Sequence, residues 1–99
     1  MGQFTVTPQE LKNKAENLQQ LNARFKGVVE TMQTQETQLQ GQWEGQAHDT
    51  FDAEFKRDIG RMMQFYNAVE EYAQKLMQIS EKYAAAERAN LQTASTRTV

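Results

Sequence analysis

The sequence predicts an all-α protein, a helix-turn-helix hairpin that dimerises into an antiparallel four-helix bundle. Two observations predict the hairpin. Apolar residues recur every seven positions along both halves of the chain, and this repeat changes phase between Gly41 and Gln46. A third observation predicts the bundle, because the repeats carry more large aromatic side chains than two facing helices can enclose. The length of 99 residues fits a single domain.

The first helix is expected to begin at Pro8. Thr7 is a favourable N-cap, Pro8 suits the first helical position, and Glu10 stands where its carboxylate can reach back to the cap N–H. Residues 1–6 are therefore predicted to form a flexible N-terminal tail. The apolar repeat begins at Leu11 and continues to the phase change, which predicts one long helix.

The phase change predicts a turn at about 41–46. Gly41 and Gly45 stand on either side of Trp43, and glycine ends helices readily because it adopts positive φ at little cost. An aromatic residue at this point can cover the open end of the bundle.

The second helix carries an apolar repeat that starts at His48 and reaches beyond Tyr83, with Asp58 as its clearest exception. The predicted hairpin spans residues 7–90. Residues 91–99 are rich in Thr and Ser and lose the repeat, so they are predicted to form a flexible C-terminal tail.

The two repeats define a predicted seam that serves both the hairpin and the dimer. Lys14, Gln35 and Asp58 are polar residues at positions of this seam. Its predicted apolar members are Leu11, Leu18, Leu21, Phe25, Val28, Met32, Leu39, Phe51, Phe55, Met62, Phe65, Val69, Tyr72, Leu76 and Ile79.

The composition excludes most catalytic and metal chemistry. The chain has no Cys and one His, so thiolate nucleophiles and Cys- or His-rich metal sites within one chain cannot be built. We therefore predict no catalytic residues, no cofactor and no metal. The formal charge of -2 argues against nucleic acid as a partner. The N-terminus has neither a basic segment nor an apolar run, which predicts no cleavable signal peptide.

Two short patterns are candidates for recognition. Trp43-Glu44-Gly45 lies at the predicted turn, where the alternative interpretation is an aromatic plug with a purely structural role. Tyr83 and Glu87 stand four residues apart on one helix face near the C-terminal end. Tyr66 and Glu70 have the same spacing, and for Tyr83 the alternative is ordinary core packing.

A Trp-x-Gly turn between two long helices, in a chain of about this length, resembles the WXG family of early secretory antigenic target-like type VII secretion substrates. The resemblance covers nearly the whole chain and includes Ala47 and Phe51 after the turn. Members carry a C-terminal Tyr-x-x-x-Asp/Glu secretion signal, which Tyr83 and Glu87 match in spacing and location. Tyr66 and Glu70 lie too far inside the helix to be the first choice.

The resemblance implies a non-enzymatic, virulence-associated protein that leaves the cytosol folded, through an ATP-driven membrane machine whose secretion ATPase is a partner. Its location is then outside the cell, free or associated with the cell surface. The other implied partner is a second copy or a paralogous WXG-type chain. A homodimer is preferred because Trp43 and the pair Tyr83 and Glu87 allow one sequence to supply both halves of a composite signal.

Two other functions fit the same residues. An intracellular coiled-coil adaptor would use Trp43 for stability only and would stay in the cytosol. A targeting helper would dock its bundle onto the helical leader of a larger secreted toxin, so that the complex is exported. A membrane-active bundle that opens at acid pH is a further alternative.

Overall fold

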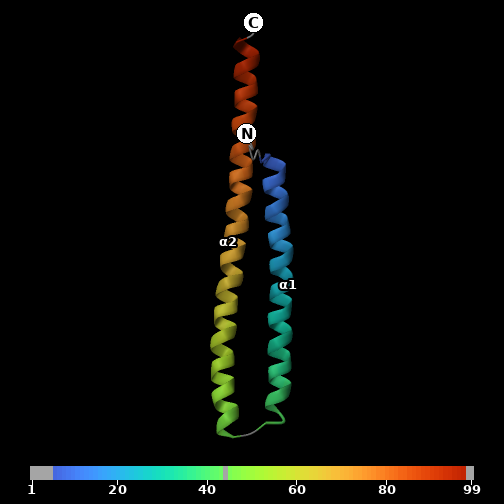
Figure 1. Ribbon diagram of the computed structural model, residues 1–99, viewed down its shortest axis with the longest axis vertical. Helices are drawn as coiled ribbons and strands as arrows, with labels where there is room; N and C mark the ends of the chain where they lie inside the picture. The colour runs from blue at the N-terminus through green and yellow to red at the C-terminus, as the bar shows by residue number, and fades with distance from the viewer. Residues whose placement is uncertain (1–5, 44, 98–99) are drawn as a thin grey trace, which may run out of the picture.

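The computed structural model describes residues 6–43 and 45–97, and the side chains as far as residue 93. Two helices run antiparallel along a rod of 82 × 25 × 17 Å, α1 from Pro8–Gln40 and α2 from Gln46–Arg97 (Figure 1). This confirms the predicted all-α hairpin. Neither helix has a stretch long and apolar enough to cross a membrane, over the residues that the structure describes.

The start of α1 is the predicted capping box. The Glu10 N–H donates to the Thr7 hydroxyl at 3.1 Å, and the Thr7 N–H donates to the Glu10 carboxylate at 3.3 Å. Two N–H groups that a helix N-terminus leaves without partners are thereby satisfied. The first five residues of the expected flexible tail lie outside the described residues, and Val6 is not helical.

The turn lies between Gln40, where α1 ends, and Gln46, where α2 begins, and its two glycines have different roles. Gly45 has φ of +113°, in the region that favours glycine, whereas Gly41 keeps a helical φ of -67°. The Gln42 N–H donates to the Leu39 carbonyl at 3.0 Å and continues the helical path by one residue. Only Gly45 therefore uses the conformational freedom that the sequence suggested for both.

The hairpin is held by a narrower set of residues than the predicted seam. None of the apolar side chains predicted for that seam is fully buried within the hairpin; the most enclosed of them are half-buried. The buried residues are Ala15, Asn22, Val29 and Glu36 in α1, at intervals of seven, with Ile59, Ala73 and Ser80 in α2, at intervals of fourteen and seven. None of the side chains predicted for the seam is among these buried residues, so on each helix the stripe that packs inside the hairpin differs from the predicted one.

The C-terminal part of α2 extends past the start of α1. The Ser80 hydroxyl donates to the Pro8 carbonyl at 2.6 Å, so residues 81–97 continue without α1 beside them (Figure 1). The sequence predicted that regular structure ends near Asn90, whereas α2 continues to Arg97. Adding residues to an existing helix costs far less than starting one, which explains a helix that outlasts its apolar repeat.

Candidate protein-protein interface

One side of the hairpin is an uncovered apolar face. Its most exposed members include Leu21, Val28 and Phe65, each 58% exposed, and Tyr72, 60% exposed. We define the apolar face as Leu18, Leu21, Phe25, Val28, Met32 and Leu39 of α1 with Phe51, Phe55, Phe65, Val69, Tyr72 and Ile79 of α2. A contiguous apolar surface of this length marks a site where another molecule binds.

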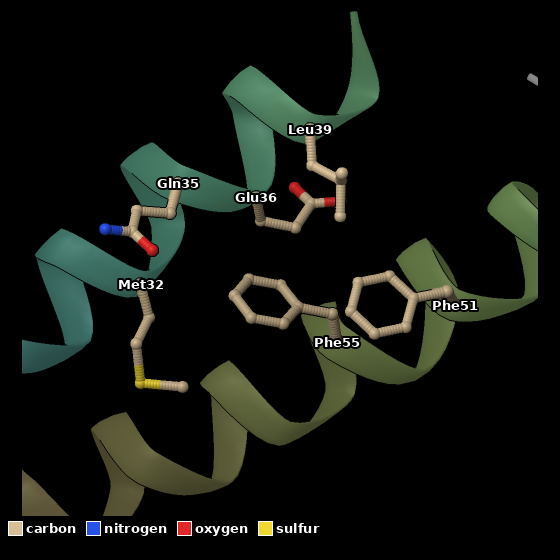
Figure 2. Close-up of a pocket in the computed structure, with 6 residues that line it drawn as sticks. All are labelled: Met32, Gln35, Glu36, Leu39, Phe51 and Phe55. Atoms are coloured by element: carbon tan, nitrogen blue, oxygen red, sulfur yellow. The ribbon is translucent and has the colours of Figure 1, made fainter. Parts of the chain in front are cut away.

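The apolar face contains two hollows between the helices. The larger, about 360 Å³, lies near the turn and is lined by Met32, Gln35, Glu36, Leu39, Phe51 and Phe55. Figure 2 shows the two phenyl rings and Leu39 directed into the same space. The second, about 260 Å³, is lined by Leu18, Leu21, Asn22, Phe25, Phe65 and Val69. Such hollows accept side chains of a facing helix.

The remaining predicted seam residues lie at the borders of this face. Leu11, Met62 and Leu76 are half-buried between the helices. Asp58 interrupts the face, is exposed, and lies 3.5 Å from the Arg61 guanidinium. Phe25 and Phe65 meet across the two helices in an edge-to-face contact with centroids 5.5 Å apart.

Trp43 begins a row of aromatic rings that leads from the turn to the apolar face. Its centroid lies 5.8 Å from that of His48, edge-on, and 5.5 Å from that of Phe51, which stacks on Phe55 at 6.0 Å. His48 Nδ1 lies 3.4 Å from an Asp49 carboxylate oxygen, and its buried Nε2 has no hydrogen-bond partner. Trp43 thus packs on α2 from the tip of the hairpin.

Tyr83 and Glu87 lie on the part of α2 beyond Ser80, at the end of the hairpin away from the turn that carries Trp43. Tyr83 is 39% exposed, and the pair lines a shallow hollow of about 340 Å³ with Ala86 and Asn90. Within one chain the turn motif and this pair are therefore far apart.

Tyr66 and Glu70, the pair of equal spacing, lie inside the hairpin. The Asn22 side chain donates to the Tyr66 carbonyl at 2.9 Å, and the Lys26 ammonium lies 5.3 Å from the centroid of the Tyr66 ring. Both Tyr66 and Glu70 are half-buried. This surrounding distinguishes them from Tyr83 and Glu87, which α1 does not reach.

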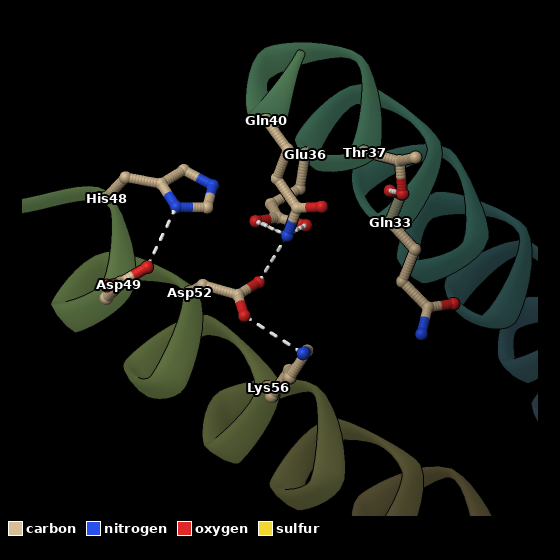
Figure 3. Close-up of polar contacts among 8 residues, drawn as sticks. All are labelled: Gln33, Glu36, Thr37, Gln40, His48, Asp49, Asp52 and Lys56. Atoms are coloured by element: carbon tan, nitrogen blue, oxygen red, sulfur yellow. Dashed lines mark hydrogen bonds and ion pairs between the residues drawn. The ribbon is translucent and has the colours of Figure 1, made fainter. Parts of the chain in front are cut away.

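A polar cluster that sequence reasoning missed joins the helices near the turn (Figure 3). The Gln40 amide donates to both carboxylate oxygens of Glu36, at 2.9 and 3.2 Å, and to Asp52 at 2.6 Å. The Lys56 ammonium lies 2.9 Å from Asp52. This ammonium, with a smaller contribution from the Gln40 amide, lowers the pKa of Asp52 against the raising effect of burial. Asp52 in turn raises the pKa of Lys56.

The signal that could have revealed Glu36 and Asn22 is their spacing. Each stands seven residues from Val29, and with Ala15 they form one series of seven-residue steps, but polar side chains hide such a series when only apolar repeats are considered. Among the residues that the structure describes, no three His, Asp or Glu side chains are placed to hold a metal ion.

A helical hairpin with an aromatic turn and an uncovered apolar face has the architecture of a small protein that offers a surface to another protein. The chain matches the model of the WXG100 family, described as proteins of 100 residues with WXG, over residues 3–88. It therefore belongs to the WXG100 family, whose members are small helical secreted proteins. The resemblance inferred from Trp43 and Gly45 is confirmed.

Relatives and solved structures match this chain over most of its length. An ESAT-6-like protein of Streptococcus agalactiae is 22% identical over 81 residues, which are 82% of this chain and 84% of the relative. The secreted protein EsxB of Bacillus anthracis superposes with a TM-score of 0.78 and 24% identity, covering 88% of this chain and 99% of the other. The wild-type EsxB structure in space group P21 gives a TM-score of 0.76 at 25% identity, covering 85% of this chain and 97% of the other.

Proposed function

We propose that this chain is a non-enzymatic substrate of a type VII secretion machine and is exported as a folded homodimer. The observation that carries the proposal is the apolar face, whose large side chains the single hairpin leaves exposed and which is joined to the Trp43 turn by a row of aromatic rings. Membership of a family of secreted proteins supports the export.

The occupant proposed for the apolar face is a second copy of the chain. The face is apolar on both helices and carries few charges, with Lys14 and Asp58 at positions of its repeat, so two copies packed antiparallel bury it on both sides. A paralogous chain with a similar face is the other partner that the family allows.

The proposed recognition surface combines Trp43 and Gly45 of one protomer with Tyr83 and Glu87 of its partner. Trp43 and Tyr83 lie at opposite ends of one hairpin, so an antiparallel pair brings each turn toward the C-terminal part of the other chain. The secretion ATPase would then read a surface that exists only in the dimer, which couples export to assembly.

Export from a host with a working type VII apparatus tests the proposal. The amount of protein in the medium is compared for the wild type, for Tyr83→Phe and Glu87→Gln, and for Tyr66→Phe with Glu70→Gln as matched controls. We expect the wild type and the controls in the medium and the Tyr83 and Glu87 variants inside the cell. Circular dichroism and light scattering confirm that each variant keeps its helices and its mass.

Each part of the proposal can fail separately. A wild type retained in the cytosol contradicts export and favours the adaptor. Normal export of the Tyr83 and Glu87 variants contradicts the proposed signal but not secretion. Recovery of the chain in a fixed molar ratio with a larger toxin favours the targeting helper.

A further inference from the structure

The seam between α1 and α2 is built from alternating polar and apolar layers. Three polar contacts cross it, each two heptads from the next: Ser80 with the Pro8 carbonyl, Asn22 with the Tyr66 carbonyl, and Gln40 between Glu36 and Asp52. Midway between them lie two buried apolar layers, Ala15 with Ala73 and Val29 with Ile59. Polar and apolar layers therefore alternate every seven residues along the hairpin.

The turn alone does not determine which residues of the helices face each other. In an antiparallel hairpin, sliding one helix past the other by seven residues moves the centre of the turn by only half that number. Gly41 and Gly45 offer two places to end a helix within this short segment. A Cβ at Gly41 would meet only the Gln38 carbonyl, at 3.6 Å, so the backbone is not crowded there.

The apolar face does not determine the alignment either. Its residues recur every seven positions, so a slide of seven residues leaves most of its apolar side chains beside apolar neighbours, although in one direction it brings Phe25 beside Asp58. The face would remain largely apolar in the shifted hairpin. Something other than the face and the turn must therefore select the observed alignment.

The alternating layers discriminate against a shift in either direction. A slide of seven residues would put the Asn22 amide opposite Ile59 or Ala73 instead of the Tyr66 carbonyl. It would also put Asp52 opposite Val29 in one direction and Glu36 opposite Ile59 in the other. Each shift also breaks the Gln40 bond to Asp52 and packs one of the two carboxylates against an apolar side chain, which is disfavoured even though Glu36 keeps Gln40 and Asp52 keeps Lys56 on its own helix.

We infer that Asn22, together with Glu36 and Asp52, sets the alignment of the two helices and thereby positions Trp43 at the tip of the hairpin. A single buried polar residue fixes alignment in coiled coils by the same physics. In the hairpin shifted toward Gly41, Trp43 would join the first turn of α2 and leave the tip. These residues are positioning residues, and the inference stands whether or not the chain is exported.

Cross-linking measures the alignment directly, because the chain has no cysteine of its own. Gln19 and Glu70 are half-buried on one edge of the seam, between the Ala15 and Asn22 layers, and report the observed alignment. Gln19 paired with Met63 or with Met77 reports the two shifted forms, which are displaced by about 10 Å along the helices. Each pair is replaced by cysteines and treated with a short bis-maleimide, and linked peptides are identified by mass spectrometry.

The three pairs are introduced into the wild type, into Asn22→Val, and into a triple variant with Asn22→Val, Glu36→Leu and Asp52→Leu. In the wild type we expect the Gln19 and Glu70 pair to link and the shifted pairs to stay near background. In Asn22→Val the shifted links should rise about tenfold relative to the wild type. The triple variant should show a larger rise, together with a changed emission maximum of Trp43, the only tryptophan.

Two controls separate alignment from stability. Gln20→Val adds the same side chain at an exposed position and should leave every link unchanged. Isotope-labelled chains distinguish links within a hairpin from links between chains. Exclusive linking of Gln19 with Glu70 in Asn22→Val and in the triple variant would show that the turn sets the alignment, and would overturn the inference. If the triple variant loses its helical circular dichroism, Asn22→Val alone is used, and exclusive linking of Gln19 with Glu70 in that variant overturns the inference.

Discussion

At the scale of single residues, the polar side chains of the seam are held by specific partners. Gln40 supplies donors to two carboxylates at once, and Lys56 offsets the charge of Asp52. Glu36 is only 9% exposed, and its carboxylate therefore loses most of its contact with water. The two hydrogen bonds from Gln40 to its oxygens offset this loss. Removal of one partner from such a cluster leaves the other buried and unsatisfied.

The lowered pKa of Asp52 predicts a pH dependence of stability. The group is ionised in the folded protein to lower pH than in the unfolded chain, so its contribution is fully present above about pH 4 and is lost as the pH falls through the folded pKa. We expect Asp52→Asn to flatten the decrease of the urea midpoint between pH 5 and pH 2.5. Asp58→Asn, at an exposed carboxylate beside Arg61, should keep the wild-type slope. Equal slopes for Asp52→Asn and the wild type would contradict the pairing with Lys56.

At the scale of the helices, α2 has a part that is packed and a part that is not. Up to Ser80 it faces α1 through buried small residues, whereas from residue 81 onward it extends alone. Ala73 is fully buried and Ala85 is exposed. A helix without tertiary packing opens locally more often than the packed part of the same helix.

Two matched alanine substitutions test this division. Both Ala73→Gly and Ala85→Gly remove one methyl group and lower helix propensity by about 1 kcal/mol. Ala73→Gly also loses packing in the seam, so we expect a decrease of about 2 kcal/mol in the global free energy of unfolding. Ala85→Gly should leave the urea midpoint nearly unchanged and accelerate amide hydrogen exchange only around residues 83–93. A global loss of equal size for both would mean that the C-terminal part of α2 is packed in solution.

At the scale of the whole molecule, the hairpin buries little apolar surface of its own. Its buried apolar residues, within the part of the chain that the structure describes, are Ala15, Val29, Ile59 and Ala73. The large aromatic residues lie on the apolar face instead. Chains this small need a further source of stability when the core is so limited, and a second copy over the face supplies it.

The proposed dimer predicts stability that depends on protein concentration. The thermal midpoint of the wild type should rise with concentration, because association stabilises the folded state by mass action. Phe65→Glu places a charge at the centre of the face, and we expect loss of the dimer mass in light scattering and of helical circular dichroism at micromolar concentration. Gln64→Glu, at the exposed neighbouring position, should behave as the wild type. A folded Phe65→Glu protein of unchanged mass would argue against this face as the dimer interface.

The sequence by itself determined the elements of the fold and the ends that local chemistry sets. Thr7, Pro8 and Glu10 form a capping box from contacts within one turn of chain, and the phase change around Gly41 and Gly45 locates the turn. Both depend on interactions between near neighbours, which a sequence displays directly.

Only the tertiary structure decided which stripe of each helix packs inside the hairpin. The apolar repeats predicted that their leucines and phenylalanines form the core. The hairpin instead buries Ala15, Asn22, Val29 and Glu36 of α1 and leaves Leu21, Val28 and Phe65 exposed. Small residues let two helices approach closely, and polar residues can hydrogen-bond across the seam. Whether such a residue suits the interior depends on the residue opposite it, which only the tertiary structure shows. The stripe of larger apolar residues then remains available for a partner. The apolar pattern alone cannot distinguish such a binding face from the interior of the hairpin.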